Sequence, residues 1–398
     1  MTGARTGARA LLGARIFTGA RFVEDHAVLL EGGDIAAVLP RAALPPLVPC
    51  EMLPGGVLAP GFVDAQVNGG GGVLFNASPD AAALARLAAA HVRCGTTALL
   101  PTLITDRPDT MRAALAAIRE AIAVPTPGIV GVHLEGPFLA PSRKGAHDPS
   151  LIRPMTEDDV ALLLGCGIAT LLLTVAAEVV PPPLIARLAA AGVIVSIGHS
   201  DAGYETAMTA AEHGARGVTH LFNAMSPLQH RAPGVVGAAL DHGGLWGGII
   251  ADGHHVHPAS LSAALRAKRG PARLFLVSDA MPLVGRVEDT FELNGRTVTR
   301  RDGALRLDDG TLAGSDLTMH AALLYTVRHL GVPLDEALRM ASLYPAGFLR
   351  LDRRYGRIAA GYRADLVHLD DALALRQVWL GGRRIAPPAG AAARPDPA

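Results

Sequence analysis

The sequence has no excess of charge of either sign and few aromatic side chains. Lys and Arg total 36 among 398 residues, Asp and Glu also total 36, and aromatic residues make up 4%. Proteins that bind nucleic acids or anionic membranes rely on a basic surplus, and single-strand binders add aromatic stacking. We therefore expect no nucleic-acid partner and no membrane partner. A local basic site for a small anion stays possible.

Cysteine is also scarce. Cys50, Cys94 and Cys166 are odd in number and lack Cys-x-x-Cys spacing, so they indicate neither a disulfide framework nor a cysteine zinc site. Arginines interrupt every apolar stretch near the N-terminus, so the continuous apolar core of a secretory signal is missing. Together these absences favour a cytoplasmic protein.

One apolar run, from Val160 to Ala177, approaches the length of a membrane span. Gly165-Cys166-Gly167 interrupts it in the middle. Because glycine ends helices, we interpret the first half as a helix end and residues 170–175 as a buried strand.

Short apolar runs alternate with helical patterns through the middle of the chain. The runs with strand character are Val57–Asn68, Thr96–Leu103, Ile129–Leu134, Thr170–Val175, Val193–Ile197, Gly217–Thr219, Trp246–Ala251 and Leu274–Val277. Between them, Thr156 before three acidic residues predicts a helix start, and Ser78 before Pro79 predicts another. Eight β/α units in series predict an α/β fold, a (β/α)8 TIM-type barrel over residues 57–356.

The two ends of the chain carry short β-like runs separated by glycine turns. Residues 1–56 and 357–390 are predicted to form one small β-sandwich domain, and residues 391–398 a disordered tail. An insertion near residues 284–311 contains Asn294-Gly295 between alternating runs, which predicts a β-hairpin. It follows the eighth strand and is expected beside the active face.

Ionisable side chains follow several of the predicted strands. Active residues of TIM barrels lie at the C-terminal ends of strands. Glu135, His199 and His220 follow the third, fifth and sixth strands, and two imidazoles with one carboxylate form a common catalytic zinc set. Asp279, after the eighth strand, suits a base that takes a proton from metal-activated water. Each residue alone fits a structural role better, but four such groups at four strand ends favour a metal hydrolase.

Several short motifs occur in order between about Pro60 and Gly361. They are Pro60-Gly-Phe-Val-Asp64, Asn68-Gly69, His133-Leu-Glu-Gly-Pro137, Lys144-Gly-Ala-His147, Gly198-His-Ser200, Thr219-His-Leu-Phe-Asn-Ala-Met225, Ile250-Ala-Asp-Gly253, Val277-Ser-Asp-Ala280, Leu312-Ala-Gly-Ser315 and Ala341-Ser-Leu-Tyr-Pro345. This series resembles the N-acetylglucosamine-6-phosphate deacetylase family of the amidohydrolase superfamily. The resemblance implies hydrolysis of the N-acetyl group of N-acetyl-D-glucosamine 6-phosphate to D-glucosamine 6-phosphate and acetate, by a homodimer.

The resemblance also implies a role for individual residues. Glu135, His199 and His220 correspond to metal ligands, and Asp279 to the general base and acid. His147 corresponds to a catalytic residue that polarises the acetyl carbonyl. The implied substrate contacts are Ala146, Asn223, Ala224, Arg231, His255, Leu312, Ala313 and Gly314. For Arg231 the chemistry agrees, because a guanidinium offers paired donors to a phosphate dianion; a solvated loop arginine is the alternative.

The end of the first strand departs from the wider superfamily. Many of its members carry His-x-His there and bind two metals, whereas this chain has Gln66-Val67-Asn68, a form found in some of the deacetylases. Neutral amides are weaker zinc ligands than imidazole. The fourth strand also lacks a lysine that could bridge two metals. We therefore predict one divalent metal ion per subunit, zinc first and Fe2+ or another ion as alternatives, with Gln66 contacting a water on the metal.

Other functions remain open from the sequence alone. The same chemistry on N-acetylgalactosamine 6-phosphate is the nearest alternative, since the sequence does not fix the C4 epimer. A dihydroorotase-like hydrolase is disfavoured by the missing His-x-His and lysine. A non-catalytic phosphosugar-binding protein should have lost a ligand or the base, yet all four residues are present.

Overall fold

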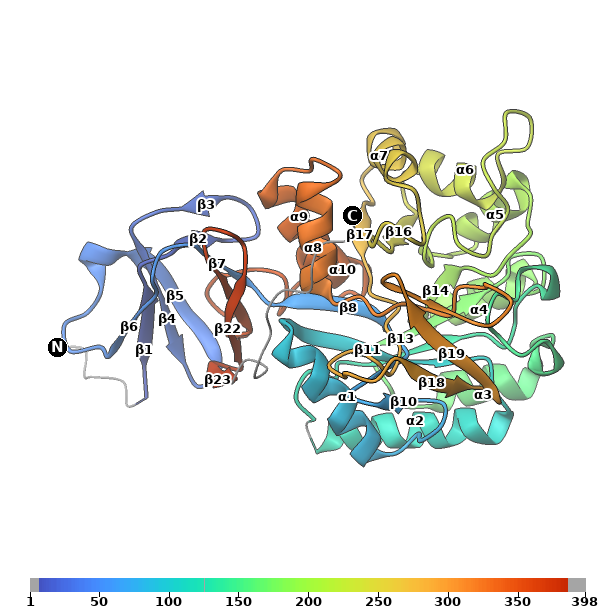
Figure 1. Ribbon diagram of the computed structural model, residues 1–398, viewed down its shortest axis with the longest axis horizontal. Coiled ribbons are helices and arrows are strands. Elements are labelled where there is room, and N and C mark those ends of the chain that lie inside the picture. Colours follow the sequence, from blue (N-terminus) through green and yellow to red (C-terminus); the bar gives the residue numbers. More distant parts are fainter. Residues whose placement is uncertain (1–6, 125, 386–398) are drawn as a thin grey trace.

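Eight parallel strands form the larger part of the molecule, and the computed structural model describes residues 7–124 and 126–385 (Figure 1). The strands are β8 (Phe62–Val67), β11 (Thr96–Ile104), β12 (Val132–Glu135), β13 (Leu171–Val175), β14 (Ile194–Ile197), β15 (Gly217–Val218), β16 (Trp246–Ile249) and β17 (Leu274–Leu276). Each pairs with the next in this order. A parallel bridge between Val67 and Ala280 joins the last strand to the first, and the Asp279 N–H donates to the Gln66 carbonyl at 3.0 Å. The predicted TIM-type barrel is confirmed.

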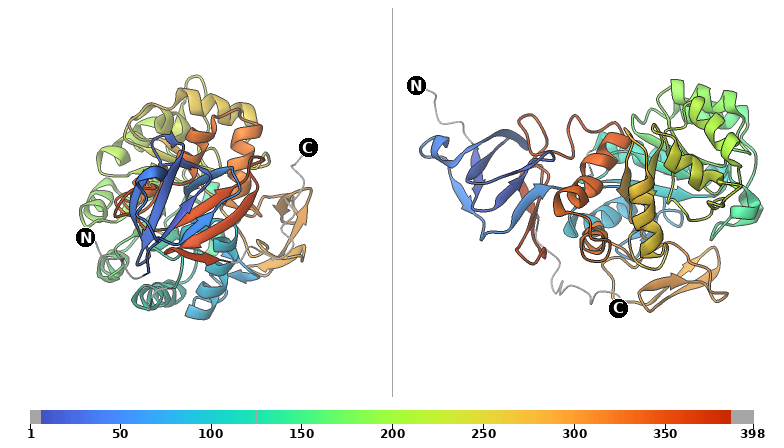
Figure 2. Two further views of the ribbon diagram at one scale, coloured as in Figure 1. Left: turned by 90° about the vertical axis from the view of Figure 1, so that its left-hand side faces the viewer. Right: turned by 90° about the horizontal axis from the view of Figure 1, so that it is seen from above.

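Helices surround this barrel, as Figure 2 shows from the end that carries the smaller sheets. They are α1 (Ala81–Arg93), α2 (Pro108–Ala123), α3 (Glu157–Gly165), α4 (Pro182–Ala190), α5 (Tyr204–Glu212), α6 (Gly234–Asp241), α7 (Pro258–Ala267), α8 (Met319–Arg328), α9 (Leu334–Ala341) and α10 (Leu343–Phe348). The strands are buried on both faces, and this is why they read as continuous apolar runs.

The helix starts test the capping predictions. Thr156 caps α3 in a capping box with Asp159, as predicted. The predicted start at Ser78 is wrong, because α1 begins at Ala81 and its cap is Asp80, whose side chain accepts the Ala83 N–H at 2.8 Å. An aspartate and a serine are nearly equal as caps, so the sequence did not distinguish the two positions.

Two smaller sheets stand beside the barrel, on the left of Figure 1. One contains β1 (Arg9–Leu12), β4 (His26–Glu31), β5 (Asp34–Pro40) and β6 (Cys50–Met52); the other contains β2 (Arg15–Phe17), β3 (Phe22–Val23), β7 (Val57–Pro60), β21 (Leu366–Leu369), β22 (Leu375–Leu380) and β23 (Arg383–Ile385). Ile16, Val28, Ile35, Leu58 and Trp379 form much of their shared core. Strands from both ends of the chain therefore build this part, and the predicted tail over 391–398 lies outside the described residues.

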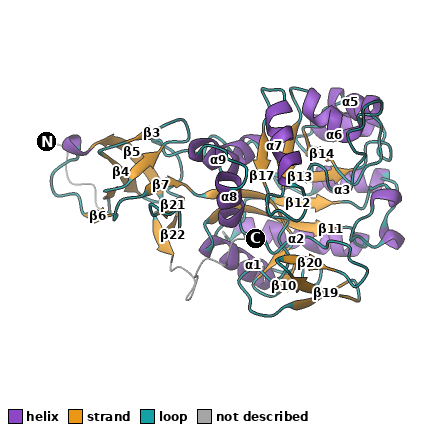
Figure 3. Ribbon diagram, turned by 45° about the horizontal axis from the view of Figure 1, so that its top comes forward, coloured by secondary structure: helices purple, strands orange, loops and turns teal. Residues whose placement is uncertain are grey.

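The run from Val57 to Asn68 is not the single barrel strand that the sequence predicted. β7 pairs with β2 and β21 in the smaller sheet, whereas β8 pairs with β11 in the barrel. Gly61 separates them, and a Cβ there would lie 2.0 Å from the Thr97 Oγ1. Because β8 starts beside the smaller sheets, the C-terminal ends of the barrel strands face away from them (Figure 3).

The insertion after the eighth strand folds as the predicted hairpin and adds one further strand. Its strands are β18 (Thr290–Leu293), β19 (Arg296–Arg301) and β20 (Ala304–Arg306), and Asn294 and Gly295 turn with φ of 52° and 71°. Leu293, Val298 and Leu305 pack against apolar residues of the neighbouring loops, including Leu74 in β10 (Val73–Leu74), which pairs with β9 (Gly69–Gly70). The insertion is therefore fixed to the barrel by a small core of its own.

The apolar run over residues 160–177 divides between α3 and β13, as predicted. Among the described residues, no helix has both the length and the apolar character needed to span a membrane.

Candidate metal centre and active site

Glu135, His199 and His220 converge at the mouth of the barrel. The Glu135 Oε1 lies 2.9 Å from the His220 Nε2 and 3.2 Å from the His199 Nε2, and the two imidazole nitrogens are 3.1 Å apart. The exposed fractions of the three residues are 2%, 4% and 4%. Their potential ligand atoms all lie within 4.8 Å of one another, so they are close enough to share one ion.

The ends of the barrel strands place these groups. Glu135 is the last residue of β12, and His199 and His220 each stand two residues beyond β14 and β15. His199, His220 and Asp279 have φ of 48°, 31° and 53°. Residues other than glycine rarely adopt this left-handed region, and such strain concentrates at functional sites. The backbone therefore turns sharply at three strand ends to aim three side chains inward.

The loop that follows β12 orients His199. The His199 Nδ1 donates to the Arg143 carbonyl at 2.8 Å, so Nε2, the atom that faces Glu135, is the ring nitrogen left to bind a metal. Gly145 allows this loop to approach, since its φ is 55° and a Cβ there would lie 3.3 Å from the imidazole. A backbone carbonyl thus selects the tautomer that a metal ligand needs.

Glu135 and His220 shift one another's pKa values toward the charged forms. Burial favours the neutral form of Glu135, but the hydrogen bonds and positive charge of His199 and His220 outweigh it and hold the Glu135 pKa well below its ordinary value. Burial opposes charge on His220 as well, yet the Glu135 carboxylate raises the His220 pKa. The three side chains therefore form an anionic and imidazole donor set of the kind that binds divalent transition metals.

A layer of hydroxyl groups supports the ligands from below. His133, two residues before Glu135 on β12, places its Nε2 2.7 Å from the Thr174 Oγ1. Thr174 is 2.7 Å from the Thr219 Oγ1, which donates to the Ser196 Oγ at 2.7 Å. These buried bonds join β12, β13 and β14 to the residue after β15, and so fix the strands that carry the ligands.

Asp279 lies beside the cluster and is held by two amides. Its Oδ1 accepts the Asn68 Nδ2 at 2.6 Å and the Gln66 Nε2 at 3.1 Å. Burial, followed by the nearby Glu135 carboxylate, raises the Asp279 pKa to about 6. A carboxylate with a pKa near neutrality and one uncommitted oxygen suits proton transfer in both directions.

His147 faces the same cluster from the loop after β12. Its ring centroid is 4.4 Å from that of His199. Its Nδ1 accepts the Thr105 N–H at 3.3 Å and lies 2.8 Å from the Thr105 Oγ1. Burial, then the charge of His199, lowers the His147 pKa to about 3. Because a backbone N–H only donates, the neutral ring carries its proton on Nε2 and presents a donor.

Comparison with known proteins identifies the scaffold. A model described as "Amidohydrolase family" matches residues 57–390, and one described as "NagA composite domain" matches residues 10–58. The chain belongs to the amidohydrolase family. Enzymes of this family are metal-dependent hydrolases, and in this amidohydrolase Glu135, His199 and His220 form a group that could hold a metal ion.

Individual relatives cover nearly the whole amidohydrolase chain. A protein of Shewanella sp. (strain ANA-3) named N-acetylgalactosamine-6-phosphate deacetylase is 42% identical, covering 93% of this chain and 94% of its own. One of Haemophilus influenzae named N-acetylglucosamine-6-phosphate deacetylase is 35% identical, covering 90% and 94%. The crystal structure of N-acetylglucosamine-6-phosphate deacetylase from Pasteurella multocida superposes with a TM-score of 0.92 at 35% identity, covering 95% of this chain and 100% of that one.

The other sequence-predicted residues of the amidohydrolase lie in loops that follow the barrel strands. Asn223 and Ala224 stand three and four residues after His220, and the Asn223 Nδ2 donates to the His220 carbonyl at 3.2 Å. Arg231 is exposed in the loop that follows, and it makes no hydrogen bond or ion pair with the described part of the chain. His255 stands six residues beyond β16 with its side chain buried, and its Nδ1 lies 2.6 Å from the Asp252 Oδ2.

The insertion and the following loop border the amidohydrolase centre on another side. The Arg296 Nη2 donates to the Ala146 carbonyl at 2.6 Å, one residue before His147. A Cβ on Gly314 would lie 2.9 Å from the Asp279 carbonyl, so the segment from Leu312 to Gly314 runs beside the base. The Ala313 side chain is buried in the apolar cluster of the insertion, which leaves only its backbone to face a substrate.

Three polar residues of this site were not predicted from the sequence. Asn68 donates to Asp279, Thr105 contacts His147, and Asp252 pairs with His255. Asn68 and Asp252 stand in quoted motifs, and Thr105 directly follows β11, so position after a strand was the available signal. Gln66, expected at a metal-bound water, donates to both Glu135 oxygens at 3.2 Å and to Asp279.

Proposed function

We propose that this amidohydrolase hydrolyses the N-acetyl group of N-acetyl-D-glucosamine 6-phosphate, giving D-glucosamine 6-phosphate and acetate. The observation that carries the proposal is the convergence of Glu135, His199 and His220 beside Asp279 at the mouth of the barrel. The substrate comes from the names of relatives at 35% identity that match almost the full chain.

Glu135, His199 and His220 hold the metal in this proposal. A divalent cation bound there supplies Lewis acidity to the acetyl carbonyl and to the attacking water. We propose one ion per subunit, and zinc in particular, because two imidazoles and one carboxylate form a frequent catalytic zinc set. Metal analysis of the purified protein tests both the number and the element.

Asp279 moves the proton in this mechanism. Asn68 and Gln66 fix its Oδ1, so Oδ2 takes a proton from the water that adds to the acetyl carbon. The same carboxyl then protonates the sugar nitrogen as the C–N bond breaks, and acetate leaves. His147 donates its Nε2–H to the acetyl oxygen, where negative charge develops.

Loop residues bind the sugar and its phosphate. Arg231 and the backbone of Asn223 and Ala224 are assigned to the phosphate and adjoining sugar oxygens, and His255 to the substrate. The backbones of Ala146 and of Leu312, Ala313 and Gly314 line the sugar. An exposed arginine without a partner in the described chain supports this assignment, because its paired donors remain available to an oxyanion.

We further propose a cytoplasmic homodimer. Three free cysteines and no disulfide among the described residues fit a reducing compartment. Light scattering on the purified protein measures the subunit number, and fractionation measures the location.

The direct test is acetate release. The zinc-loaded enzyme should release one acetate and one free amine per N-acetyl-D-glucosamine 6-phosphate, and Arg231→Ala should raise KM strongly for this substrate. Unphosphorylated N-acetylglucosamine turned over equally well by the parent enzyme would contradict the phosphate site. A protein that binds metal and substrate but releases no acetate would instead be a phosphosugar-binding protein.

A specific observation also favours N-acetylgalactosamine 6-phosphate as substrate. The Shewanella relative with that name is 42% identical, more than the 35% of the Haemophilus protein. Parallel measurements of kcat/KM on the two 6-phosphates decide the C4 preference. A ratio above about ten for the galactose epimer would replace the first proposal without changing the chemistry.

A further inference from the structure

The loop after β12 contacts both the main chain and the side chain of His199. The Ala140 N–H donates to the His199 carbonyl at 2.9 Å, and the His199 Nδ1 donates to the Arg143 carbonyl at 2.8 Å. An acceptor of this kind fixes the ring orientation of a metal-binding histidine. The position of the Arg143 carbonyl therefore matters for metal binding.

Apolar packing does not hold that carbonyl in place. Arg143 ends a single turn of 3-10 helix, Pro141–Arg143, which buries none of its residues and has no side-chain cap. The second half of the loop is better fixed, because Arg296 bonds the Ala146 carbonyl and His147 is buried. The first half therefore needs an anchor of another kind.

Asp201 supplies this anchor from the turn after β14. Its Oδ1 accepts the Arg143 Nε at 2.8 Å and lies 2.7 Å from the Arg143 Nη2, and its Oδ2 accepts the Ser142 hydroxyl at 3.4 Å. Asp201 stands two residues after His199. The same turn therefore contacts Arg143 twice, with His199 at the carbonyl and Asp201 at the guanidinium.

Asp201 is itself held by Glu178, in the loop after β13. The Glu178 Oε1 accepts the Asp201 N–H at 2.6 Å, and its Oε2 accepts the Ser200 hydroxyl at 2.6 Å. Ser200 is buried, and its Oγ also accepts the Ala177 N–H at 3.3 Å. The turn that presents the Asp201 carboxylate is thus bonded to the end of the neighbouring strand.

We propose that Asp201 is a positioning residue that acts through Arg143 to orient the metal ligand His199. The inference rests on the proposed metal centre and deepens it. The side chains of Arg143 and Asp201 are 33% and 46% exposed, so their ion pair adds little to the stability of the fold. Its effect is to restrict the carbonyl that the imidazole bonds. Loss of the pair should therefore weaken the metal site and leave the fold intact.

Asp241 offers a matched control for Asp201. It is the last residue of α6, its Oδ1 lies 2.7 Å from the Arg269 Nη1, and its Oδ2 accepts the Tyr204 hydroxyl at 2.6 Å. Its side chain is 43% exposed, close to the 46% of Asp201. Asp241→Ala therefore removes the same kind of carboxylate and leaves the loop after β12 untouched.

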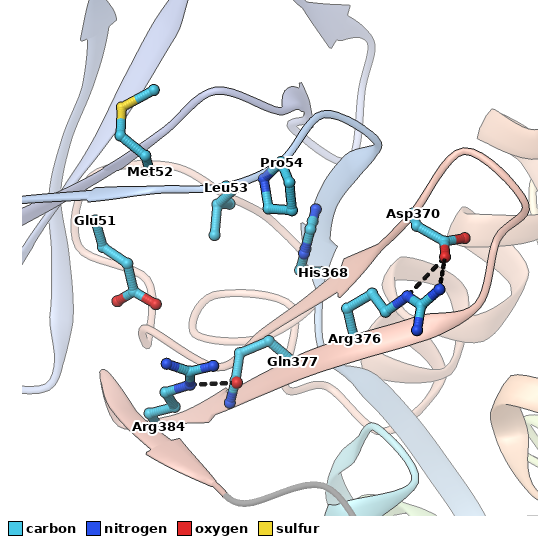
Figure 4. A pocket seen from close by; sticks show the side chains of 9 residues that line it. All are labelled: Glu51, Met52, Leu53, Pro54, His368, Asp370, Arg376, Gln377 and Arg384. Atoms are coloured by element: carbon cyan, nitrogen blue, oxygen red, sulfur yellow. Dashed lines mark hydrogen bonds and ion pairs between the residues drawn. The ribbon is translucent and has the colours of Figure 1, made fainter. Parts of the chain in front are cut away.

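Arg376 offers a matched control for Arg143. Its Nε and Nη2 both lie 2.6 Å from one oxygen of Asp370, just as the two Arg143 nitrogens share one oxygen of Asp201. Figure 4 shows this pair beside a pocket between the two smaller sheets, at the other end of the barrel from the metal centre. Arg376→Ala therefore removes a guanidinium of the same geometry far from His199.

The zinc affinity of the full-length enzyme, measured by competition with a chelating dye, tests the proposal. Asp201→Ala and Arg143→Ala should each weaken zinc binding roughly fivefold, the upper end of what an exposed ion pair contributes. The two effects should not add in the double variant, because both changes remove the same contact. Asp241→Ala and Arg376→Ala should bind zinc like the parent. Equal zinc affinity in Asp201→Ala and Asp241→Ala overturns the proposal, and so do additive effects.

Two further measurements separate this role from a purely structural one. With zinc in excess, kcat of Asp201→Ala should stay within about twofold of the parent, since Arg296 fixes the loop beside His147. Tm of the metal-free protein should shift by less than about 2 °C. A lower kcat or a larger loss of Tm at unchanged zinc affinity overturns the proposal.

Failure of the proposed function is distinguishable from failure of this inference. A parent that binds zinc but releases no acetate contradicts the hydrolase, and the zinc affinities still test Asp201. A parent that binds no zinc contradicts the metal centre, and amide exchange then decides whether Asp201 holds the carbonyl. The Arg143 N–H, which donates to the Ala140 carbonyl at 2.9 Å, should exchange faster in Asp201→Ala than in Asp241→Ala. Equal exchange overturns the inference.

Discussion

Replacing Asp279 by asparagine separates two effects of this buried carboxylate: the stability that its burial costs the fold, and the proton transfer that it performs in catalysis. Asparagine has the same shape, and its Oδ1 can keep the two bonds from Asn68 and Gln66. The uncommitted oxygen becomes an amide nitrogen, which takes up no proton. The fold, metal content and substrate binding should therefore persist while proton transfer is lost.

The structure gives a magnitude for each effect. Loss of a positioned general base costs about 10²- to 10⁴-fold in kcat, or about 3–5 kcal/mol of barrier. Burial and the Glu135 charge raise the Asp279 pKa from 3.8 to about 6. For an acid this means that the folded state holds the proton more tightly. Above pH 6 the metal-free protein therefore carries a penalty of about 3 kcal/mol, which vanishes as the pH falls toward 3.8.

Two assays check this pair of effects. In metal-free protein at pH 8, Asp279→Asn should raise Tm by about 3–4 °C, and the gain should shrink as the pH falls through 6 toward 4. In metal-loaded protein, acetate release should collapse while calorimetry still detects substrate binding. Asp241→Asn, which removes a surface carboxylate bonded to Tyr204 at 2.6 Å, serves as control. Near-normal turnover would refute the base, and an unchanged Tm would refute the electrostatic argument.

Three further perturbations follow from the structure. Chelation of the metal should abolish acetate release and lower Tm, zinc should restore both, and full activity at undetectable metal content would contradict the centre. Arg296→Ala removes the bond to the Ala146 carbonyl at 2.6 Å and should lower kcat roughly tenfold by loosening the loop of His147, whereas Arg306→Ala, which loses only a local bond to Gly310 at 3.0 Å, should not. Burial lowers the His91 pKa from 6.5 to about 4. Between these two values the unfolded state binds a proton at His91 and the folded state does not. Stability should fall by about 2 kcal/mol between pH 7.5 and 5, and His91→Gln should flatten that dependence in thermal melts.

Local patterns predicted much of the fold because they are decided by near neighbours. Thr156 with three following acids sets a helix start through its own backbone bonds, and Asn294-Gly295 sets a hairpin turn through positive φ. The start at Ser78 failed for the same reason, since Asp80 offers an equivalent local cap two residues later. The run from Val57 to Asn68 failed differently. Apolar character indicates a buried strand but not the sheet to which the strand belongs. The run divides at Gly61, which packs closely against the Thr97 side chain, and this contact is visible only in the tertiary structure.

The sequence by itself determined the chemistry that is available: four imidazoles, two carboxylates and a guanidinium, each at a predicted strand end or in a loop. Tertiary structure alone decided how they are used. Asn68 donates a hydrogen bond to one Asp279 oxygen and leaves the other available. The Arg143 carbonyl bonds the Nδ1 of His199, Thr105 that of His147, and Asp252 that of His255, and each bond decides which ring nitrogen carries a proton. These partners come from different strands and loops, and a hydrogen bond acts only over about 3 Å. Spacing along the chain carries no record of such contacts.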